Sequence, residues 1–314
     1  MSTLITGGTG FIGPVLARLL LEHDVGPIVL FDLFPNEDNI REFRGEVTTI
    51  RGDFAEATEL ARVLSEHAVR DVFHLAYMVG HAESNTFPAR AIRTNCSGTN
   101  AVFECAMAAG VRRVLWPSSA AVQGATVTSA SPRWHTEDDP ATPDSLYGAC
   151  KLFNEHVAEL HHAHEGFDHV ALRLSSVAGP GRADRRGITP DLYATILERS
   201  VRGEQVVTPP ADHVLTWGYV EDAARAFYRL YAADTLEHRI YNFAGPVTTV
   251  GEVTDLVRSA CPGAQIEHAA DAQRHIAYLD ARRLAEDLDF SPAYSLQEAI
   301  ADHLERIASR QGSP

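Results

Sequence analysis

Two serines and a tyrosine–lysine pair are the residues of this chain best suited to move a proton. Ser118 and Ser119 end a predicted strand, and Tyr147 and Lys151 follow in a helix predicted to begin near Ser145. Residues four apart share one helix face, so the phenol and the ammonium are expected side by side. A phenol has a pKa of about 10, roughly three units too high for a base at neutral pH. A neighbouring ammonium favours the phenolate and lowers that pKa.

The order of these residues in the chain makes the interpretation specific. A Tyr-x-x-x-Lys pair alone is common on amphipathic helices, where it contributes roughly a few tenths of a kcal/mol. Here a glycine-rich turn comes first, then the strand that ends in serines, then the pair, then another strand. The hydroxyl of Ser119 would hold a substrate oxygen against Tyr147 during proton transfer. We therefore predict Ser119, Tyr147 and Lys151 as the catalytic residues.

The glycine-rich turn at the start of the chain predicts a nucleotide site. A strand at residues 2–6 runs into Gly7, Gly10 and Gly13, and an amphipathic segment follows at residues 15–21. A pyrophosphate needs bare backbone N–H groups and the positive end of a helix, and glycines allow it to come close.

A carboxylate lies where the same motif requires one. The strand at residues 27–31 ends at Asp32, about 20 positions beyond the turn, where an acidic side chain binds the adenosine ribose hydroxyls. The following Leu33 and Phe34 offer no cation to a further phosphate, so the predicted cofactor is NAD and not NADP.

Strand and helix patterns alternate through the first half of the chain. Predicted strands cover residues 2–6, 27–31, 47–51, 71–76, 111–116 and 170–174, with helices near 56–67, 87–109 and from about 145. This alternation predicts an α/β fold, a doubly wound parallel sheet of the Rossmann type with a smaller, mostly C-terminal substrate lobe. Ligands of such sheets bind beyond the carboxyl ends of the strands, where Asp32, Asp53, Ala76, Ser119 and Ser175 all fall.

The composition and the strand–helix pattern of the sequence change after about residue 174. Glycines, prolines and arginines crowd residues 179–190, and the strand–helix rhythm becomes irregular. We therefore predict an NAD-binding domain at residues 1–174 and a region at 175–314 that forms mainly the substrate lobe. Strands near 214–220 and 239–244 are expected to return to the main sheet.

Composition excludes several classes of protein. The 314 residues are 45% hydrophobic, and no run reaches the 18 or so apolar residues of a membrane span. A net charge of −15 argues against nucleic acid and anionic membranes as partners. The first strand begins at residue 2, which leaves no room for a signal peptide, and the four cysteines show no C-x-x-C spacing. We expect a cytoplasmic enzyme with reduced thiols.

In sequence, these motifs resemble those of the extended short-chain dehydrogenases/reductases, in the group of NAD-dependent epimerases and dehydratases. The matching segments are, in order, 6–13, Asp53, 74–76, Thr94-Asn95 with Gly98-Thr99, 118–124, 147–151, Gly179-Pro180, 220–222 and Tyr241-Asn242. The resemblance implies that Tyr147 is the base, that Lys151 modulates it and binds a ribose, and that Ser119 orients the substrate. The cofactor-binding set expected with it is Gly7, Gly10, Phe11, Ile12, Gly13, Asp32, Asp53, Phe54, Leu75, Ala76, Tyr77, Asn95, Tyr147, Lys151 and Ser175, with Asp53 and Phe54 beside the adenine.

Departures from the group's motifs bear on the substrate. Ser176 stands where sugar-nucleotide enzymes usually carry the Asn of Arg-x-x-Asn-x-x-Gly-Pro, and Leu215-Thr216 precede Trp217 in place of the usual Arg-Asp. Gln123 replaces the usual Tyr of the serine motif. The missing groups commonly hold a substrate diphosphate. We therefore predict an NAD-dependent oxidoreductase that acts on a small polar alcohol or ketone, such as a hydroxy acid, an amino alcohol or a sugar derivative.

Two other functions remain open. One is a nucleoside-diphosphate-sugar epimerase or dehydratase with tightly bound NAD, and the other is a non-catalytic NAD-sensing protein on the same fold. The presence of Ser119, Tyr147 and Lys151 together favours an enzyme, because a sensor needs none of them. The candidate substrate residues are His81, Ser119, Ser176, Arg182, Arg185 and Trp217.

No metal site is predicted, because His161, His162 and His164 resemble one only by composition. The family resemblance implies a homodimer in which the helices near 87–109 and 145–164 form a four-helix interface. Apolar residues compatible with that interface are Ala91, Val102, Phe103, Ala106, Leu152, Val157 and Leu160.

Overall fold

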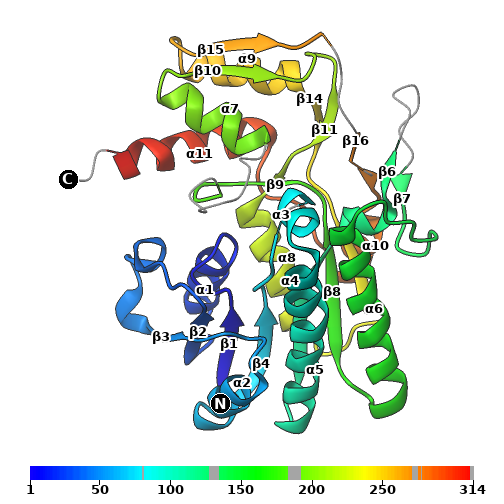
Figure 1. The fold of residues 1–314 in the computed structure, drawn as a ribbon. Helices are drawn as coiled ribbons and strands as arrows, with labels where there is room; N and C mark the ends of the chain where they lie inside the picture. The colour runs from blue at the N-terminus through cyan, green and yellow to red at the C-terminus, as the bar shows by residue number, and fades with distance from the viewer. Residues whose placement is uncertain (80, 127–133, 183–191, 271–274, 277, 312–314) are drawn as a thin grey trace.

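A parallel sheet of seven strands, which we call the main sheet, forms the centre of the molecule (Figure 1). The computed structural model describes residues 1–79, 81–126, 134–182, 192–270, 275–276 and 278–311. The strand order is β13-β8-β5-β4-β1-β2-β3, and every neighbouring pair is parallel. The strands are β1 (Ser2–Thr6), β2 (Ile28–Asp32), β3 (Val47–Arg51), β4 (Val69–His74), β5 (Arg113–Ser119), β8 (His169–Leu174) and β13 (Ile240–Phe243).

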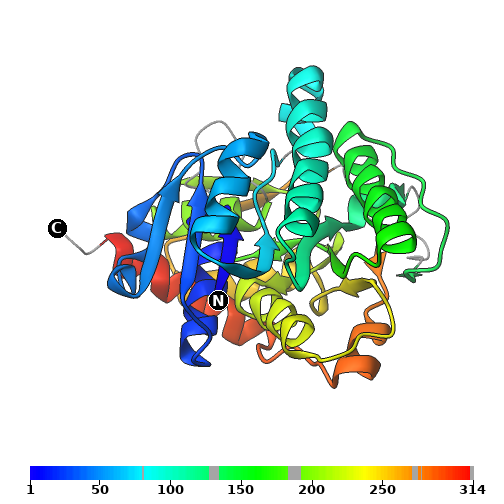
Figure 2. The same cartoon turned by 90° about the horizontal axis from the view of Figure 1, so that it is seen from below.

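Helices cover both faces of the main sheet, which is why its central strands carry apolar residues in unbroken runs. On one face α1 (Gly13–Glu22) and α8 (Val220–Ala232) pack together, and their core includes Leu16, Leu20 and Phe227. The opposite face is covered by α2 (Ala57–Glu66), α5 (Thr99–Ala108) and α6 (Leu146–Glu165). Figures 1 and 2 show α5 and α6 side by side on that face. The prediction of a doubly wound α/β fold is confirmed.

A second group of elements lies beyond the carboxyl ends of the strands, at the top of Figure 1. It contains α7 (Leu192–Val201), β10 (Gln205–Thr208), α9 (Val250–Ala260), β15 (Gln265–His268) and α11 (Leu296–Gln311), with β10 and β15 paired in parallel. Shorter elements connect the two parts or border them: α3 (His81–Thr86), α4 (Pro88–Ile92), β6 (Ala125–Thr126), β7 (Trp134–His135), β9 (Val177–Ala178), β11 (Val214–Thr216), β12 (Gly218–Tyr219), β14 (Val247–Thr249), β16 (His275–Ile276), β17 (Tyr278–Leu279) and α10 (Arg282–Leu288).

The segment near 214–220 does not return to the main sheet as expected. Its β11 pairs antiparallel with β14, and β12 pairs with β9. The other expected strand, β13, does join the main sheet at its edge beside β8. Both segments are short and apolar, and their pairing depends on partners far along the chain that the local pattern does not identify.

The helix predicted at residues 87–109 is interrupted. It consists of α4, a π-helical turn at Arg93–Gly98, and α5. A π-turn inserts one extra residue into the helical ladder and is frequent at functional sites. Among the described residues, no helix has both the length and the apolar character that crossing a bilayer requires.

Candidate active site

The three predicted catalytic residues meet where β5 ends and α6 begins. Ser119 is the last residue of β5, and Tyr147 and Lys151 lie in the first two turns of α6. The helix begins here because the Ser145 hydroxyl accepts a hydrogen bond from the Gly148 amide, 3.2 Å away, and so caps the first turn. Ser119 and Tyr147 share a side-chain hydrogen bond.

The electrostatic setting of Tyr147 differs from the sequence expectation. Burial dominates and raises the pKa of the phenol, while the hydrogen bond from Ser119 and the positive charge of Arg182 oppose that rise. Lys151 was the cation expected to lower this pKa, but its ammonium is directed elsewhere. In this arrangement Arg182 is the cation that favours the phenolate.

Lys151 is almost completely buried, with 2% of its surface exposed. Its ammonium donates a 2.6 Å hydrogen bond to the carbonyl of Pro117 and lies 3.3 Å from the centre of the Tyr77 ring. Burial lowers the pKa of Lys151 to about 7, against the opposing influence of Glu155 and Cys150. It is also the only lysine in the chain, because every other basic side chain besides histidine is arginine.

A buried ion pair ties the catalytic strand end to the helix. Glu155, one turn beyond Lys151, accepts hydrogen bonds from both Nε and Nη2 of Arg173 on β8, at 2.9 and 2.8 Å. The Ser118 hydroxyl donates to the same carboxylate at 2.5 Å. These hydrogen bonds connect β5, β8 and α6 to one another next to Ser119 and one helical turn from Lys151.

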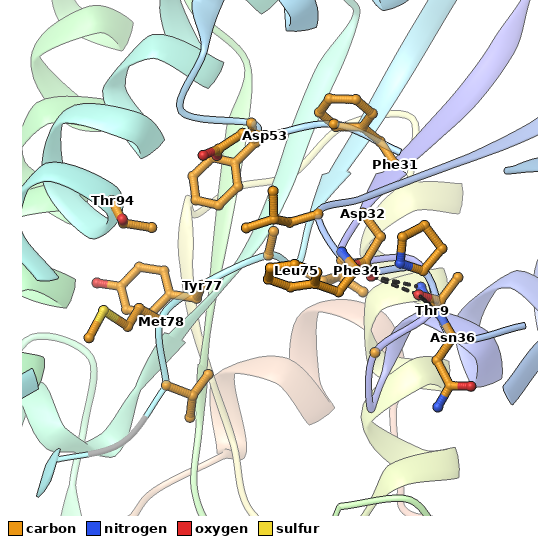
Figure 3. Close-up of a pocket in the computed structure, with 18 of the residues that line it drawn as sticks. Thr9, Phe31, Asp32, Phe34, Asn36, Asp53, Leu75, Tyr77, Met78 and Thr94 are labelled. Atoms are coloured by element: carbon orange, nitrogen blue, oxygen red, sulfur yellow. Dashed lines mark hydrogen bonds between the residues drawn. The ribbon is translucent and has the colours of Figure 1, made fainter. Parts of the chain in front are cut away.

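A cavity of about 1230 Å³ extends from the glycine-rich turn to Tyr77, whose ring packs against Tyr147 (Figure 3). Ser119, Tyr147 and Lys151 are not among the described residues of its wall. The cavity is larger than the roughly 300–1,000 Å³ of a typical small-molecule pocket, as a dinucleotide requires. The predicted cofactor residues on its wall are Gly7, Gly10, Asp32, Asp53, Phe54, Leu75, Ala76 and Tyr77.

The glycine-rich turn fits a pyrophosphate. Gly7 adopts φ +65°, and a Cβ there would come within 2.8 Å of the Ala76 amide nitrogen. A Cβ on Gly13 would meet the Gly7 carbonyl oxygen at 2.6 Å, so the turn and the start of α1 pack backbone to backbone. No described side chain caps α1 at its N-cap, Ile12. Its first amides therefore stay available to an anion.

Asp32 ends β2 on the cavity wall, next to Thr9 of the glycine-rich turn, as Figure 3 shows. One carboxylate oxygen accepts hydrogen bonds from the hydroxyl and the amide of Thr9, at 2.9 and 3.2 Å. The other accepts from the Phe34 amide at 3.2 Å. These contacts fix the carboxylate beside the turn, where it is placed to receive ribose hydroxyls.

The remaining predicted cofactor residues lie off the cavity wall. Asn95 is fully buried, and its amide spans the Met78 backbone, accepting from its N–H at 2.9 Å and donating to its C=O at 3.0 Å. The Phe11 ring lies 5.2 Å from the Arg182 guanidinium. Ser175 carries a buried hydroxyl with no hydrogen-bond partner among the described residues, which leaves it available to a ligand.

Sequence reasoning missed part of the wall. Arg90, Arg93 and Thr94 reach the cavity from α4 and the π-turn, together with residues that follow β2 and β4: Leu33, Phe34, Pro35, Asn36, Glu37, Asp38, Asn39, Met78 and Val79. The local sequence of residues 88–98 reads as plain amphipathic helix. The helical register that turns its side chains toward the cavity is set by the π-turn, for which the pattern gives no signal.

The candidate substrate residues do not form one group. The positive charge of Arg182 acts on the Tyr147 phenol, and its guanidinium donates to the Val177 carbonyl at 2.5 Å. Ser176 shares a hydrogen bond with Tyr193. Trp217 is 1% exposed and packs edge-on against Tyr193 in the core, and it is not among the described residues that line the cofactor cavity. Arg185 and the side chain of His81 lie outside the described residues.

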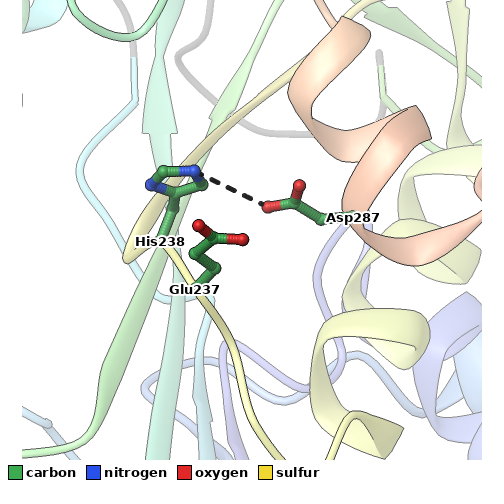
Figure 4. A group of neighbouring side chains, drawn as sticks. All are labelled: Glu237, His238 and Asp287. Atoms are coloured by element: carbon green, nitrogen blue, oxygen red, sulfur yellow. Dashed lines mark ion pairs between the residues drawn. The ribbon is translucent and has the colours of Figure 1, made fainter.

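One group of side chains away from the cavity has metal-ligating chemistry. Glu237, His238 and Asp287 bring their ligand atoms within 4.8 Å of one another (Figure 4). Asp287 already accepts a 3.0 Å hydrogen bond from Tyr241 and faces the His238 ring at 3.9 Å. These contacts account for the arrangement, and we assign no metal to it. His161 and His162 use ring nitrogens for hydrogen bonds to Asn100 and the Phe167 carbonyl, each at 3.0 Å.

The chain belongs to the NAD-dependent epimerase/dehydratase family, whose family model matches residues 3–244. It is therefore an NAD-dependent enzyme, as the sequence predicted. A UDP-glucose 4-epimerase of Azospirillum brasilense is 32% identical over 184 residues, which cover 59% of this chain and 51% of that protein. A dTDP-glucose 4,6-dehydratase of Streptomyces griseus is 28% identical over 313 residues, or 95% of this chain and 91% of the relative.

Solved structures show the same likeness over the whole chain. A UDP-glucose 4-epimerase from Thermotoga maritima, solved with UDP-glucose, has a TM-score of 0.88 at 25% identity and covers 99% of this chain and 100% of its own. An L-threonine dehydrogenase from Cupriavidus necator has a TM-score of 0.83 at 27% identity, covering 98% and 100%. Enzymes of nucleotide sugars are prominent among these relatives, which supports the epimerase/dehydratase alternative better than our main prediction of a small alcohol.

Proposed function

We propose that this chain binds NAD in the cavity and transiently oxidises a hydroxyl carbon of a nucleoside-diphosphate sugar, as an epimerase or a dehydratase. The reaction class rests on the hydrogen-bonded Ser119–Tyr147 pair beside the cavity. The substrate class rests on relatives that are UDP-glucose 4-epimerases and dTDP-glucose 4,6-dehydratases.

The chain's own residues would act on the substrate proton. Tyr147 takes the proton of the reacting hydroxyl and returns it later, and Ser119 holds the substrate oxygen in line with the phenol. Arg182 favours the phenolate during this exchange. Lys151 holds the nicotinamide ribose through a charged hydrogen bond. Bound NAD supplies the hydride acceptor.

The cofactor-holding roles follow the geometry of the wall. Gly7, Gly10 and the first amides of α1 would carry the pyrophosphate, and Asp32 the adenosine ribose. Asp53 and Phe54 border the far part of the cavity, where the adenine would lie.

A second candidate is net oxidation of a small polar alcohol, and one observation favours it. The position of the usual Arg-Asp pair is occupied by Leu215 and Thr216, both buried, and the following Trp217 lies in the core. Nothing described at these positions offers a cation to a substrate diphosphate. The threonine dehydrogenase from Cupriavidus necator shares the fold at a TM-score of 0.83.

Substrate screening separates the candidates. Purified protein is analysed for bound NAD and then incubated with UDP-glucose, dTDP-glucose and related nucleotide sugars, and products are followed by NMR. We expect a changed sugar without net formation of NADH. Growth of absorbance at 340 nm with a free hydroxy acid or amino alcohol, together with inert nucleotide sugars, would support the second candidate. Bound NAD with neither reaction would favour a sensor.

A further inference from the structure

The Lys151 ammonium has an unusual set of neighbours. An ammonium carries three N–H donors, and one of them is used by the Pro117 carbonyl at 2.6 Å. The face of the Tyr77 ring lies 3.3 Å from Nζ, closer than the Tyr147 ring at 5.7 Å. The ammonium is therefore held between a carbonyl and an aromatic face.

The Tyr77 ring is held in place by its chain neighbours. The Ala76 amide donates to the Thr6 hydroxyl at 3.2 Å, and the Met78 backbone is bound on both its N–H and its C=O by Asn95. The carbonyl of Asn95 in turn accepts a 2.9 Å hydrogen bond from Asn154 on α6. The loop that carries Tyr77 and the helix that carries Lys151 are thus joined through the side chains of Asn95 and Asn154.

Tyr77 also connects the cavity with the catalytic residues. Its ring lines the cavity, as Figure 3 shows, and packs edge-to-face on Tyr147 with ring centres 5.8 Å apart. The polar neighbour of its buried hydroxyl is the Asn154 side chain on α6, so the contact with Lys151 is made by the ring and not by the oxygen.

We propose that Tyr77 is a positioning residue that holds the Lys151 ammonium, charged, at the edge of the cavity through the face of its ring. The inference depends on the proposed function in one respect, namely that the ammonium binds a ribose of the cofactor. A cation–π contact stabilises the charged form of lysine, and it is strongest when water is excluded. Removing the ring should therefore make Lys151 lose its proton at a lower pH.

Other groups also act on the charge of Lys151, and they must stay constant in a test. The titratable groups that face it from α6, β4 and the adjoining loop are Cys150, Glu155, Tyr147, His74 and Tyr77. Burial lowers the pKa of His74 to about 3, so this ring stays neutral above about pH 4. Of these groups, Tyr147 also contacts the Tyr77 ring, and Tyr77→Phe keeps that contact, so this variant is the reference for the ring-less ones.

The single lysine allows a direct measurement. Full-length protein labelled with [6-¹³C]lysine gives one lysine side-chain signal, whose shift with pH reports the protonation of Lys151. We expect a midpoint of about 7 in the wild type and a closely similar one in Tyr77→Phe, which keeps the ring. In Tyr77→Leu the midpoint should fall by about one pH unit, a tenfold change in the protonation equilibrium.

Phe54→Leu is the matched control. It removes another aromatic ring from the same cavity, one that packs on His74 and not on the ammonium, so the midpoint should stay at the wild-type value. Should Tyr77→Leu fail to fold, Tyr77→Met provides the same loss of the ring at similar length. A wild-type midpoint in either ring-less variant would overturn the proposal.

Calorimetric titration with NAD⁺ extends the test to the cofactor. The ratio of the Tyr77→Leu dissociation constant to that of the wild type should be about tenfold larger at pH 8 than near pH 5.5, where Lys151 is charged in both and only the lost contact of the ring with the cofactor remains. Tyr77→Phe should restore wild-type binding. If NAD⁺ fails to bind the wild type, the proposed function is wrong, while the lysine titration still decides the role of Tyr77.

Discussion

At the scale of single residues, we predict that proton transfer depends on Tyr147. If it is the acid–base group, Tyr147→Phe should lower turnover by roughly 10²–10⁴-fold, the usual loss when a positioned acid–base group is removed. NAD⁺ affinity should change little, because the phenyl ring still packs on Tyr77 and the glycine-rich turn is untouched. Steady-state kinetics and calorimetry check the two parts. Near-wild-type turnover would show that this phenol is not the base.

Arg182 controls the pH at which that phenol becomes active. Its positive charge lowers the pKa of Tyr147 against the rise that burial causes. Loss of the cation in Arg182→Leu should raise the phenol pKa further, so the acid limb of the kcat/KM profile moves to higher pH by about one unit. Arg258→Leu, which removes a partly exposed arginine from α9, should leave the profile unchanged. An unshifted acid limb in Arg182→Leu would exclude this role.

Cofactor selectivity depends on Asp32 and its surroundings. The carboxylate should repel the extra phosphate of NADP, so we expect the wild type to bind NADH more tightly than NADPH. The structure also shows a cation that the residues adjacent to Asp32 in the sequence do not supply. Arg51 on β3 pairs in register with Asp32 on β2, and its guanidinium lies over the Phe34 ring. Asp32→Asn should therefore reduce the preference at least about tenfold, measured as the ratio of the two dissociation constants. Tighter binding of NADPH by the wild type would contradict the prediction.

At the scale of elements, the buried Glu155–Arg173 pair joins α6 to β8. Both side chains are nearly inaccessible, at 3% and 4% exposure. Breaking a buried pair leaves an uncompensated charge and costs roughly 3–5 kcal/mol. Glu155→Gln should lower the free energy of unfolding by about that amount in urea denaturation. Adding Arg173→Met should restore part of it, since the unpaired charge is then gone.

Glu165→Gln serves as the control for this series, because its side chain is 58% exposed at the end of the same helix. It should change the free energy of unfolding by less than about 0.5 kcal/mol. An equal effect of the two substitutions would mean that the Glu155–Arg173 pair contributes nothing specific to the joint between α6 and β8.

The elements that the sequence predicted are those whose signals are local. The strand, glycine-rich turn and helix at residues 2–22 and the Ser145 cap of α6 each depend on residues within a few positions of one another. The pairing of β11 with β14 and of β12 with β9 depends on partners distant in the chain, and the prediction there was wrong. The burial of Trp217 in the core follows from the same distant pairing, and its role toward a substrate stays a prediction.

The same distinction applies within the site. Spacing brought Tyr147 and Lys151 to one helix face, but it could not show that the ammonium is directed to Pro117 and Tyr77. Those contacts come from β5 and the loop after β4, which only the assembled sheet places beside α6. Side-chain direction at a buried charge is thus a tertiary property, and a motif predicts the residues without predicting what they touch.

At the scale of the whole molecule, we predict a homodimer through α4 and α6. Four of the expected interface residues, Ala91, Val102, Phe103 and Ala106, are buried in the core and not available to a partner. Other apolar side chains of the same region do face outward: Phe87, Ile92, Phe153 and Leu160 are 46–57% exposed. Phe153 and Leu160 are seven residues apart, two helical turns, and so share one face of α6.

Light scattering of the purified chain at micromolar concentration should give twice the mass of one chain, since two-fold dimers are the commonest assembly of such enzymes. The double variant Phe153→Asp/Leu160→Asp should be monomeric, because each carboxylate would be buried without a partner in the interface. Val207→Asp replaces an equally exposed apolar residue on β10, away from α6, and should remain dimeric. The α6 face is the interface only if the first variant dissociates while the second does not, because dissociation of both would indicate a general effect of added charge.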